Sequence, residues 1–141
     1  MDETDRKLLA ALSENARRST TELGRRLGLS RTTVQSRIER LERRGVVLGY
    51  TARLSGEYVA GAVRAHVMIT VRPKEARAVE AALRAIPEVR VLQTVSGSFD
   101  MVAQVVAAST PEMDELVDAI GALPGVERTT TSIVLSTKFD R

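Results

Sequence analysis

The sequence predicts an α+β chain: a helical head joined by a short strand to a body that alternates strands and helices. Three observations predict this class. Apolar residues recur at helical spacing up to about residue 45. Beyond residue 62, strand-like alternation and helical spacing take turns. The body also repeats itself, since the segment Ala85–Val89 (AIPEV) returns as Ala122–Val126 (ALPGV), each time between a predicted helix and a predicted strand. We therefore divide the chain into a head (1–46), a connector (47–61) and a body (62–141).

Composition bounds the possible functions. The chain has 141 residues and no cysteine, so disulfides and thiolate chemistry are excluded, and a reducing cytoplasm is the expected location. No apolar run approaches membrane-spanning length and no signal peptide opens the sequence, so we expect no membrane contact. We also expect no cofactor and no metal, because one histidine without a second histidine or a cysteine offers no set of metal ligands.

The segment 30–45 predicts one helix, with residues suited to capping at both of its ends. Ser30 suits the N-terminal cap, and Gly45 suits the left-handed turn that stops a helix. Val34, Ile38 and Leu41 fall at i, i+4 and i+7, so they form one apolar stripe.

Two shorter helices precede it. The first is predicted from about Asp2 to Ser13, and the second begins at the capping-box pattern Ser19–Glu22 and breaks at Gly28. Three short helices with a glycine-containing turn between the last two predict a winged helix-turn-helix head, whose third helix enters the DNA major groove.

The connector and body follow. Residues 46–54 are β-branched and partly alternating, which predicts a short strand. The body then predicts a β-α-β-β-α-β order, the ferredoxin-like arrangement with both helices on one face of an antiparallel sheet. The predicted elements are a strand at 63–71, a helix at 74–86, strands at 89–95 and 100–107, a helix at 111–123 and a strand at 126–137.

The body also predicts self-association. Apart from Gln104, the strand Met101–Ala107 is apolar on both faces, while the helices of one subunit cover only one face. A second subunit is the simplest cover for the other, so we expect a homodimer formed sheet to sheet. His66, Met68 and Thr70 should lie on the open face, and we expect His66 to be an interface or core residue rather than a catalytic one.

Charge is concentrated in the head. Residues 17–44 contain nine arginines and three glutamates, whereas residues 51–141 contain ten basic and eleven acidic residues. Arginine and glutamine can read base edges through paired hydrogen bonds, and hydroxyls bind phosphates. The predicted DNA contacts fall in two groups. Expected near bases and adjacent phosphates are Ser30, Arg31, Thr32, Thr33, Gln35, Ser36 and Arg37. Expected on phosphates are Arg17, Arg18, Arg25, Arg26 and Arg40.

The whole chain resembles the Lrp/AsnC (feast/famine) family of transcriptional regulators. The resemblance is carried by four segments of the head and one turn of the body. They are Asp2–Leu9 (DETDRKLL), Glu22–Ser30 (ELGRRLGLS), Arg37–Glu42 (RIERLE), Gly45–Val47 and the turn Gly97–Asp100 (GSFD), which matches a Gly-x-x-Asp pattern.

The resemblance implies a body that binds an amino acid or related metabolite between neighbouring dimers, which assemble into tetramers or octamers. Carried over residue by residue, the effector site falls on Gly97, Ser98, Phe99 and Asp100, with Thr130, Thr131 and Ser132. Asp100 can hold an ammonium group and the hydroxyls add hydrogen bonds. Ser98 departs from the family, in which many members carry an acidic residue there. The alternative is a purely structural turn, with Gly97 forming a tight hairpin and Asp100 capping it.

The predicted function is a sequence-specific regulator that binds double-stranded DNA at a pseudo-palindromic operator. Two heads on a two-fold axis would contact half-sites one or more helical turns apart. An enzyme is not expected, because the sequence has no nucleophilic cysteine and no phosphate-binding glycine loop with lysine. The alternative is a nucleoid-associated architectural protein, which would share the head but bind DNA with little sequence preference.

Overall fold

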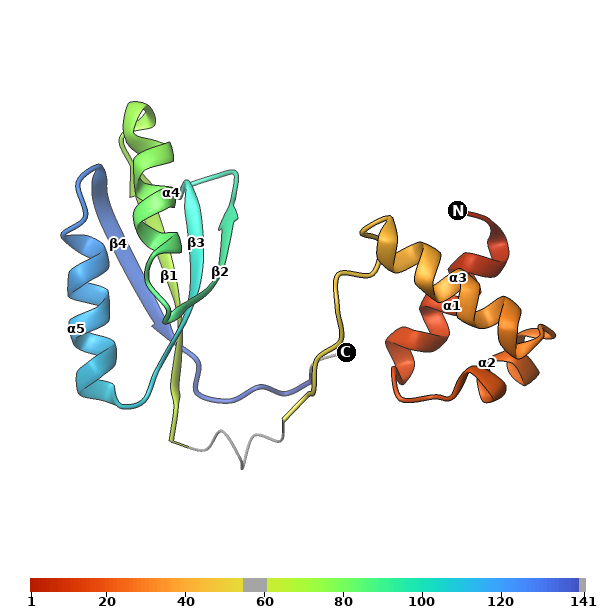
Figure 1. Ribbon diagram of the computed structural model, residues 1–141. Coiled ribbons are helices and arrows are strands. Elements are labelled where there is room, and N and C mark those ends of the chain that lie inside the picture. Colours follow the sequence, from red (N-terminus) through yellow and green to blue (C-terminus); the bar gives the residue numbers. More distant parts are fainter. Residues whose placement is uncertain (55–60, 140–141) are drawn as a thin grey trace. The chain divides into compact units, whose positions relative to one another are not determined.

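The computed structural model describes residues 1–54 and 61–139, and its contacts divide the chain into two compact units, 1–53 and 54–141. The first unit holds the helices α1 (Glu3–Glu14), α2 (Thr20–Leu27) and α3 (Arg31–Arg43) (Figure 1). The second holds β1 (Val63–Val71), the 3₁₀ turn η1 (Pro73–Glu75), α4 (Ala76–Arg84), β2 (Val89–Thr94), β3 (Met101–Ala107), α5 (Thr110–Gly121) and β4 (Val126–Ile133). The α+β class and the β-α-β-β-α-β order are confirmed.

The helices of the head begin and end within two residues of the predicted positions. Asp2 caps α1 and Ser19 caps α2, each in a complete capping box, and Ser30 caps α3 through the backbone N–H of Thr33. Gly28 and Gly45 both adopt the left-handed conformation expected where a helix stops. The head core is formed by fully or nearly buried apolar side chains of all three helices, namely Leu8, Ala11, Leu12, Leu23, Val34 and Leu41.

Gly24, within α2, has a packing role that was not predicted. A Cβ atom at this position would lie 2.6 Å from the carbonyl oxygen of Leu29, which belongs to the turn leading into α3. Leu29 also donates its backbone N–H to the carbonyl of Gly24 at 2.9 Å. Only glycine allows the two backbones to approach this closely, so Gly24 sets how tightly α2 turns into α3.

The predicted connector strand is absent from the described residues. Residues 46–54 form neither a strand nor a wing, and the rest of the connector prediction, residues 55–60, lies outside the described residues. A strand needs a hydrogen-bonded neighbouring strand, and among the described residues none is paired with this segment. Val47 is half-buried against the head core, whereas Leu48 and Tyr50 are exposed, at 93% and 54%.

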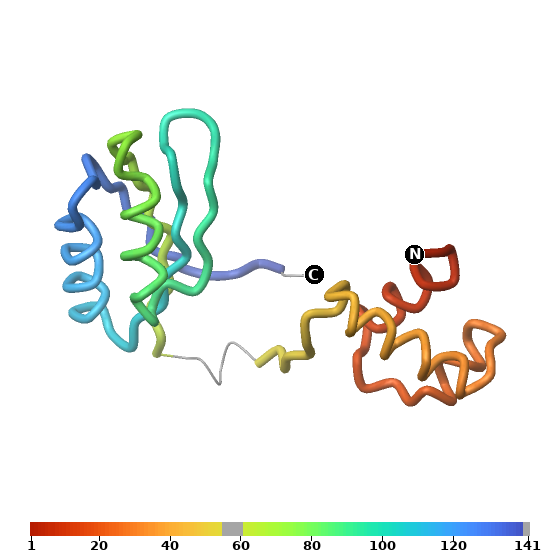
Figure 2. Tube along the Cα trace, turned by 45° about the horizontal axis from the view of Figure 1, so that its top comes forward, coloured from red at the N-terminus to blue at the C-terminus, as the bar shows by residue number. Residues whose placement is uncertain are grey.

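The sheet has strand order β2-β3-β1-β4 and is antiparallel throughout. One face is covered by α4 and α5, which lie on the same side of the sheet (Figure 2). Buried side chains on this face include Ala65, Val67, Ile69 and Val71 of β1, which alternate as predicted. The body helix begins after a short 3₁₀ turn rather than at residue 74, and the last strand ends at Ile133 rather than 137.

The other face of the sheet carries no helix, and we call it the helix-free face. By strand register it presents Arg64, His66, Met68 and Thr70 of β1, Val102, Gln104 and Val106 of β3, Val91 and Gln93 of β2, and Arg128, Thr130 and Ser132 of β4. The predicted placement of His66, Met68 and Thr70 on this face is confirmed.

Candidate nucleic-acid interface and effector turn

The first half of α3 presents an exposed polar surface that points away from the head core. Arg31, Thr32, Gln35 and Ser36 are all exposed, on the side opposite the buried Val34 and Leu41. Within the described residues the guanidinium of Arg31 has no ion pair, so its hydrogen-bond donors are available. A helix with free donors and hydroxyls on its exposed N-terminal half is what major-groove reading requires.

The hydroxyl groups at the start of α3 form a small cluster. Ser30 Oγ lies 3.0 Å from Thr32 Oγ1 and 2.7 Å from Thr33 Oγ1, and it accepts the N–H of Thr33 at 3.1 Å. The Ser36 hydroxyl donates to the carbonyl of Thr33, and Gln35 Nε2 donates to Glu39 Oε1 at 2.8 Å. Ser30 and Thr33 therefore stabilise the N-terminus of α3, while the Gln35 side chain is hydrogen-bonded to Glu39 along the exposed face.

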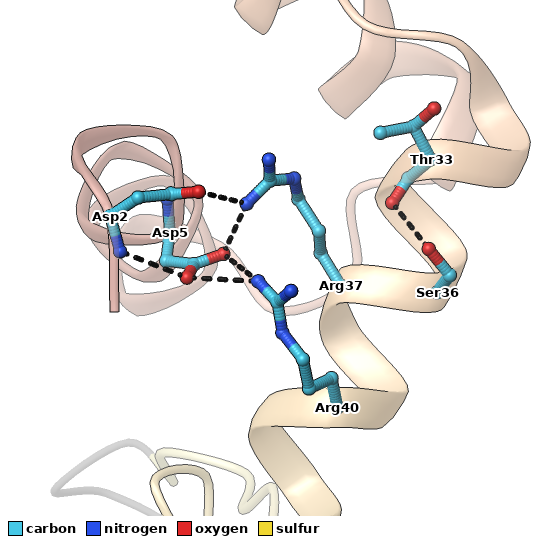
Figure 3. A network of polar contacts seen from close by, with 6 residues as sticks. All are labelled: Asp2, Asp5, Thr33, Ser36, Arg37 and Arg40. Carbon is cyan, nitrogen blue, oxygen red and sulfur yellow. Dashed lines mark hydrogen bonds and ion pairs between the residues drawn. The ribbon is translucent and has the colours of Figure 1, made fainter.

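Arg37 and Arg40 point the other way, toward α1 (Figure 3). Arg37 donates to both Asp2 and Asp5, each at 2.7 Å, and Arg40 donates to the two carboxylate oxygens of Asp5 at 2.9 and 3.0 Å. Asp5 also accepts the backbone N–H of Asp2. We call this set of four residues the α1–α3 clamp.

Asp5 is the centre of the clamp. Its side chain is 1% exposed, and burial by itself would raise its pKa. The hydrogen bonds from Arg37 and from the amide of Asp2, with the nearby charge of Arg40, outweigh that burial and lower the pKa to about 2. A buried carboxylate with two guanidinium partners ties the first helix of the head to the third.

A second ion-pair group fastens α2 to the end of α1. Glu14 accepts from Arg26 at 2.8 and 3.1 Å and from Arg18 at 2.8 Å, and Arg18 also donates to the carbonyl of Ala11. The hydrogen bonds from Arg26 and then Arg18 lower the pKa of Glu14 to about 2. By contrast, the side chains of Arg17 and Arg25 are exposed and have no ion pair within residues 1–54.

The predicted DNA-contact residues thus separate into two groups. Four arginines, 18, 26, 37 and 40, are held by acidic residues of α1, whereas Arg17, Arg25 and Arg31 are not. The prediction missed the acidic partners because Asp2 and Asp5 suit the positive end of a helix dipole, which by itself explained their position. The signal that could have found Asp5 is its helical register, since Leu8 and Leu12 follow it at i+3 and i+7 and place it on the buried side.

The turn 95–100 joins β2 to β3. Gly97 has φ +112°, a conformation that side-chain-bearing residues rarely adopt, so glycine is required there. Asp100 donates its backbone N–H to the carbonyl of Ile69 at 3.0 Å, and its carboxylate Oδ2 accepts the N–H of Val71 at 2.9 Å. The bond from Val71 to Asp100 lies at the point where the pairing of β1 with β4 shifts register, between Thr70 and Val71.

The Asp100 carboxylate therefore makes a structural contact, to β1 rather than to its own hairpin, and the turn also has features of a ligand site. Only one carboxylate oxygen of Asp100 has a partner among the described residues. Phe99 lies under the guanidinium of Arg128 on β4, 5.8 Å from ring centroid to Cζ. The hydroxyl of the neighbouring Thr70 is buried and has no hydrogen-bond partner within residues 61–139.

The structure does not bring all three predicted β4 residues to one face. Thr130 and Ser132 lie on the helix-free face, opposite Met68 and His66 of β1. Thr131 opposes Val67 on the helix-covered face, and its hydroxyl is buried. The alternation of side chains along a strand predicts this separation, so the information was present in the sequence.

Two features that would suggest other functions are not found in the described residues. Residues 1–54 and 61–139 contain no group of three or more histidine, aspartate and glutamate side chains arranged to hold a metal. Within the same ranges, every helix is too short or too polar to cross a membrane.

Comparison with known proteins matches both units. A model of the AsnC-type helix-turn-helix domain matches residues 1–42, and a model of the Lrp/AsnC ligand binding domain matches residues 64–141. The HTH-type transcriptional regulator LrpA of Mycobacterium tuberculosis is 38% identical over 140 residues, covering 99% of this chain and 93% of that protein.

Two solved relatives carry a ligand. A feast or famine regulatory protein from M. tuberculosis complexed with L-methionine is 38% identical, with a TM-score of 0.89 over 99% of this chain and 95% of that one. A transcriptional regulator from Neisseria meningitidis in complex with L-Met is 31% identical, with a TM-score of 0.87 and coverage of 99% and 93%. With both of its units matched in order, this chain belongs to the Lrp/AsnC family of transcriptional regulators, as a DNA-binding regulator with a ligand-binding domain and not an enzyme.

Proposed function

We propose that the chain acts as a homodimer that reads a pseudo-palindromic operator with α3, in the compartment that holds the chromosome, the cytoplasm. The observation that carries this proposal is the division of α3 into two faces. Arg37 and Arg40 fasten the helix to α1, while Arg31, Thr32, Gln35 and Ser36 are left exposed. A recognition helix needs both a rigid mount and a free polar face.

The arginines then take different roles. Arg31 is the proposed base-reading arginine, and Arg17 and Arg25 contact phosphates. Arg18, Arg26, Arg37 and Arg40 hold the three helices in place and add positive potential, with Ser30 and Thr33 maintaining the helix end that faces DNA. Phosphate contacts orient a protein on the duplex, whereas base contacts specify the sequence.

The test uses an operator selected from random duplexes, followed by affinity measurements at several salt concentrations. A sequence-specific regulator should bind the selected site at least about a thousandfold more tightly than random duplex. Arg31→Ala should cost about 1–3 kcal/mol on the selected site and relax its sequence preference. If the unmodified protein binds the selected site and random duplex with nearly equal affinity, the nucleoid-associated alternative is favoured.

The Arg25→Gln variant tests the proposed phosphate contact, in contrast to the base contact of Arg31. It should weaken binding to specific and random duplex alike and lower the slope of log affinity against log salt by about one, because one phosphate contact is lost. Arg77→Gln, an exposed arginine on α4 in the other unit, is the matched control and should change neither quantity. If Arg25→Gln alters sequence preference, its assignment to phosphate is wrong.

We also propose that the body senses an amino acid at an effector site made of Gly97, Ser98, Phe99, Asp100, Thr130 and Ser132, completed by a neighbouring dimer. Three observations support this site. Among the described residues, one oxygen of Asp100 has no partner, and neither has the hydroxyl of Thr70, which lies in sequence between Ile69 and Val71, the two residues that bond Asp100. In addition, two relatives are complexed with L-methionine. Thr131 is left out, because it lies on the helix-covered face. Ligand at such a junction would change the balance between dimers and tetramers or octamers.

Thermal stability across the twenty amino acids tests this site. A ligand that binds only the folded protein adds about 2.7 kcal/mol at a hundredfold excess over its dissociation constant. Asp100→Asn should abolish the shift, since it keeps an oxygen for the Val71 amide and removes the charge that an ammonium needs. Asp114→Asn, on the exposed side of α5, is the control. An undiminished shift in Asp100→Asn would remove Asp100 from the site.

A further inference from the structure

A hollow of about 350 Å³ lies in the body between α4 and the edge strand β2. Its walls come from Glu80 and Arg84 of α4 and from Arg90 and Thr94 of β2, and Val89, Leu92 and Met101 complete its lining. None of these residues belongs to the effector site proposed above, and the hollow opens on the helix-covered side of the sheet rather than on the helix-free face.

The floor of the hollow is apolar. Met101 is 4% exposed and belongs to the core, whereas Leu92 and Val89 are only half-buried although they face the helices. No residue of β2 is fully buried, because the strand lies at the sheet edge and the helices leave it partly uncovered. A strip of aliphatic surface therefore remains accessible beside α4.

The rim is charged, and a backbone irregularity places one of its charges. Val89 pairs with Val105 and Val91 pairs with Gln104, so Arg90 is an extra residue with no counterpart on β3. A bulge of this kind redirects a side chain, and here it adds Arg90 to the lining of the hollow. Within residues 61–139 Arg90 has no ion pair, while Arg84 is neutralised by Glu80 at 2.9 Å.

These features specify the chemistry of a ligand. The two arginines and one glutamate leave one net positive charge, which a single carboxylate would balance. The apolar floor would bury a short aliphatic chain, and the Thr94 hydroxyl offers one further hydrogen bond. Small-molecule pockets in proteins begin at about 300 Å³, so the volume suits a ligand the size of a small amino acid and not a large cofactor.

We infer that the hollow between α4 and β2 is a second small-molecule site, which binds an aliphatic monocarboxylate through Arg90, with the chain of the ligand against Leu92 and Met101. Both an α-amino acid with an aliphatic side chain and the corresponding 2-oxo acid have this chemistry. They differ in that the ammonium group of the amino acid would face Glu80. The site lies within one subunit, so its occupancy does not depend on the assembly of dimers.

The test is a titration of the full-length protein followed by NMR, with the protein labelled with ¹⁵N and at the methyl groups of leucine, valine and methionine. The probes are L-leucine, 4-methyl-2-oxopentanoate and 4-methylpentanoate, with the neutral 4-methylpentanamide as the control ligand. At least one acid should shift the methyl signals of Leu92 and Met101 in a saturable way, and the amide should bind at least tenfold more weakly.

Variants locate the binding. Arg90→Gln should weaken binding of the acid at least tenfold, and Arg77→Gln, which removes the same charge from α4 outside the lining, should leave it unchanged. Tighter binding of L-leucine than of 4-methyl-2-oxopentanoate would support a Glu80–ammonium contact, and the reverse order would support recognition of the carboxylate alone.

The inference is overturned if no acid shifts the Leu92 and Met101 signals, or if Arg90→Gln binds as well as the unmodified protein. Shifts confined to the backbone amides of Gly97–Asp100 would also overturn it, while supporting the effector site proposed above. The two proposals can therefore fail independently.

Discussion

Asp5 shows how a single residue can decide the role of others far along the chain. It lies 32 and 35 residues before Arg37 and Arg40 in sequence, and its carboxylate accepts from both guanidinium groups while 1% exposed. A guanidinium that donates its hydrogen bonds to a buried carboxylate cannot use the same donors to bind a DNA base. In the proposed function, the clamp therefore makes Arg37 and Arg40 structural supports of α3 rather than readers of bases.

Gly24 is the residue whose replacement should be most informative for the head. In Gly24→Ala the added methyl group would lie 2.6 Å from the Leu29 carbonyl, so the turn between α2 and α3 must shift. We expect a loss of about 1–3 kcal/mol in the free energy of unfolding, typical of overpacking, measured by urea denaturation. Ala10→Gly, at an exposed site of α1, is a control that changes only helix propensity. Unchanged stability in Gly24→Ala would show that the turn can relax.

At the scale of elements, the head is held together by carboxylates of α1 with strongly lowered pKa values. The pKa of Asp5 is lowered from 3.8 to about 2, and the pKa of Glu14 is lowered from 4.5 to about 2. A carboxylate whose pKa is lower in the folded state than in the unfolded state stabilises the fold fully above the unfolded value. That contribution is lost as the pH falls through the folded value.

The head should therefore lose stability as the pH falls from about 4.5 to about 2. The measurement is the urea midpoint of the helical circular dichroism signal at a series of pH values. In a Glu14→Gln variant, the part of the pH dependence that comes from Glu14 should disappear, while Glu39→Gln, on the exposed side of α3, is the matched control. A flat profile between these pH values in the unmodified protein would contradict the role given to the two carboxylates.

At the scale of the whole molecule, the helix-free face is the proposed dimer interface. Met68 opposes Val102 across β1 and β3, and both are half-buried in the isolated chain. Val102→Glu would place a charge in the middle of that interface, where it would be desolvated without a partner. We expect the variant to sediment as a monomer and to lose most of its operator affinity, because two linked heads bind far more tightly than one.

Ala119→Glu adds the same charge on the exposed side of α5 and should leave the sedimentation and the DNA affinity unchanged. Circular dichroism confirms that both variants fold. A Val102→Glu variant that remains a dimer would exclude this face as the interface and favour the exposed connector, with Leu48, as the contact.

Much of the fold was predictable because its signals are local. The capping residues Ser19 and Ser30, the left-handed Gly28 and the alternation along β1 each act within a few residues of the chain, so the sequence pattern and the structure agree. The connector at 46–54 was predicted as a strand on the same kind of local evidence, and this was wrong for the isolated chain. β-propensity is satisfied only when a second strand supplies hydrogen bonds.

The candidate site was predictable in position but not in its division of roles. The sequence by itself determined which helix is exposed and basic, where the Gly97–Asp100 turn lies, and that Thr130 and Thr131 must face opposite ways, because all of these depend on helical or strand periodicity. Only the tertiary structure decided that Asp5 captures Arg37 and Arg40, that Asp100 holds the Val71 amide, and that Arg90 lines a hollow. Those contacts depend on how distant segments cross in space, and no local pattern specifies that geometry.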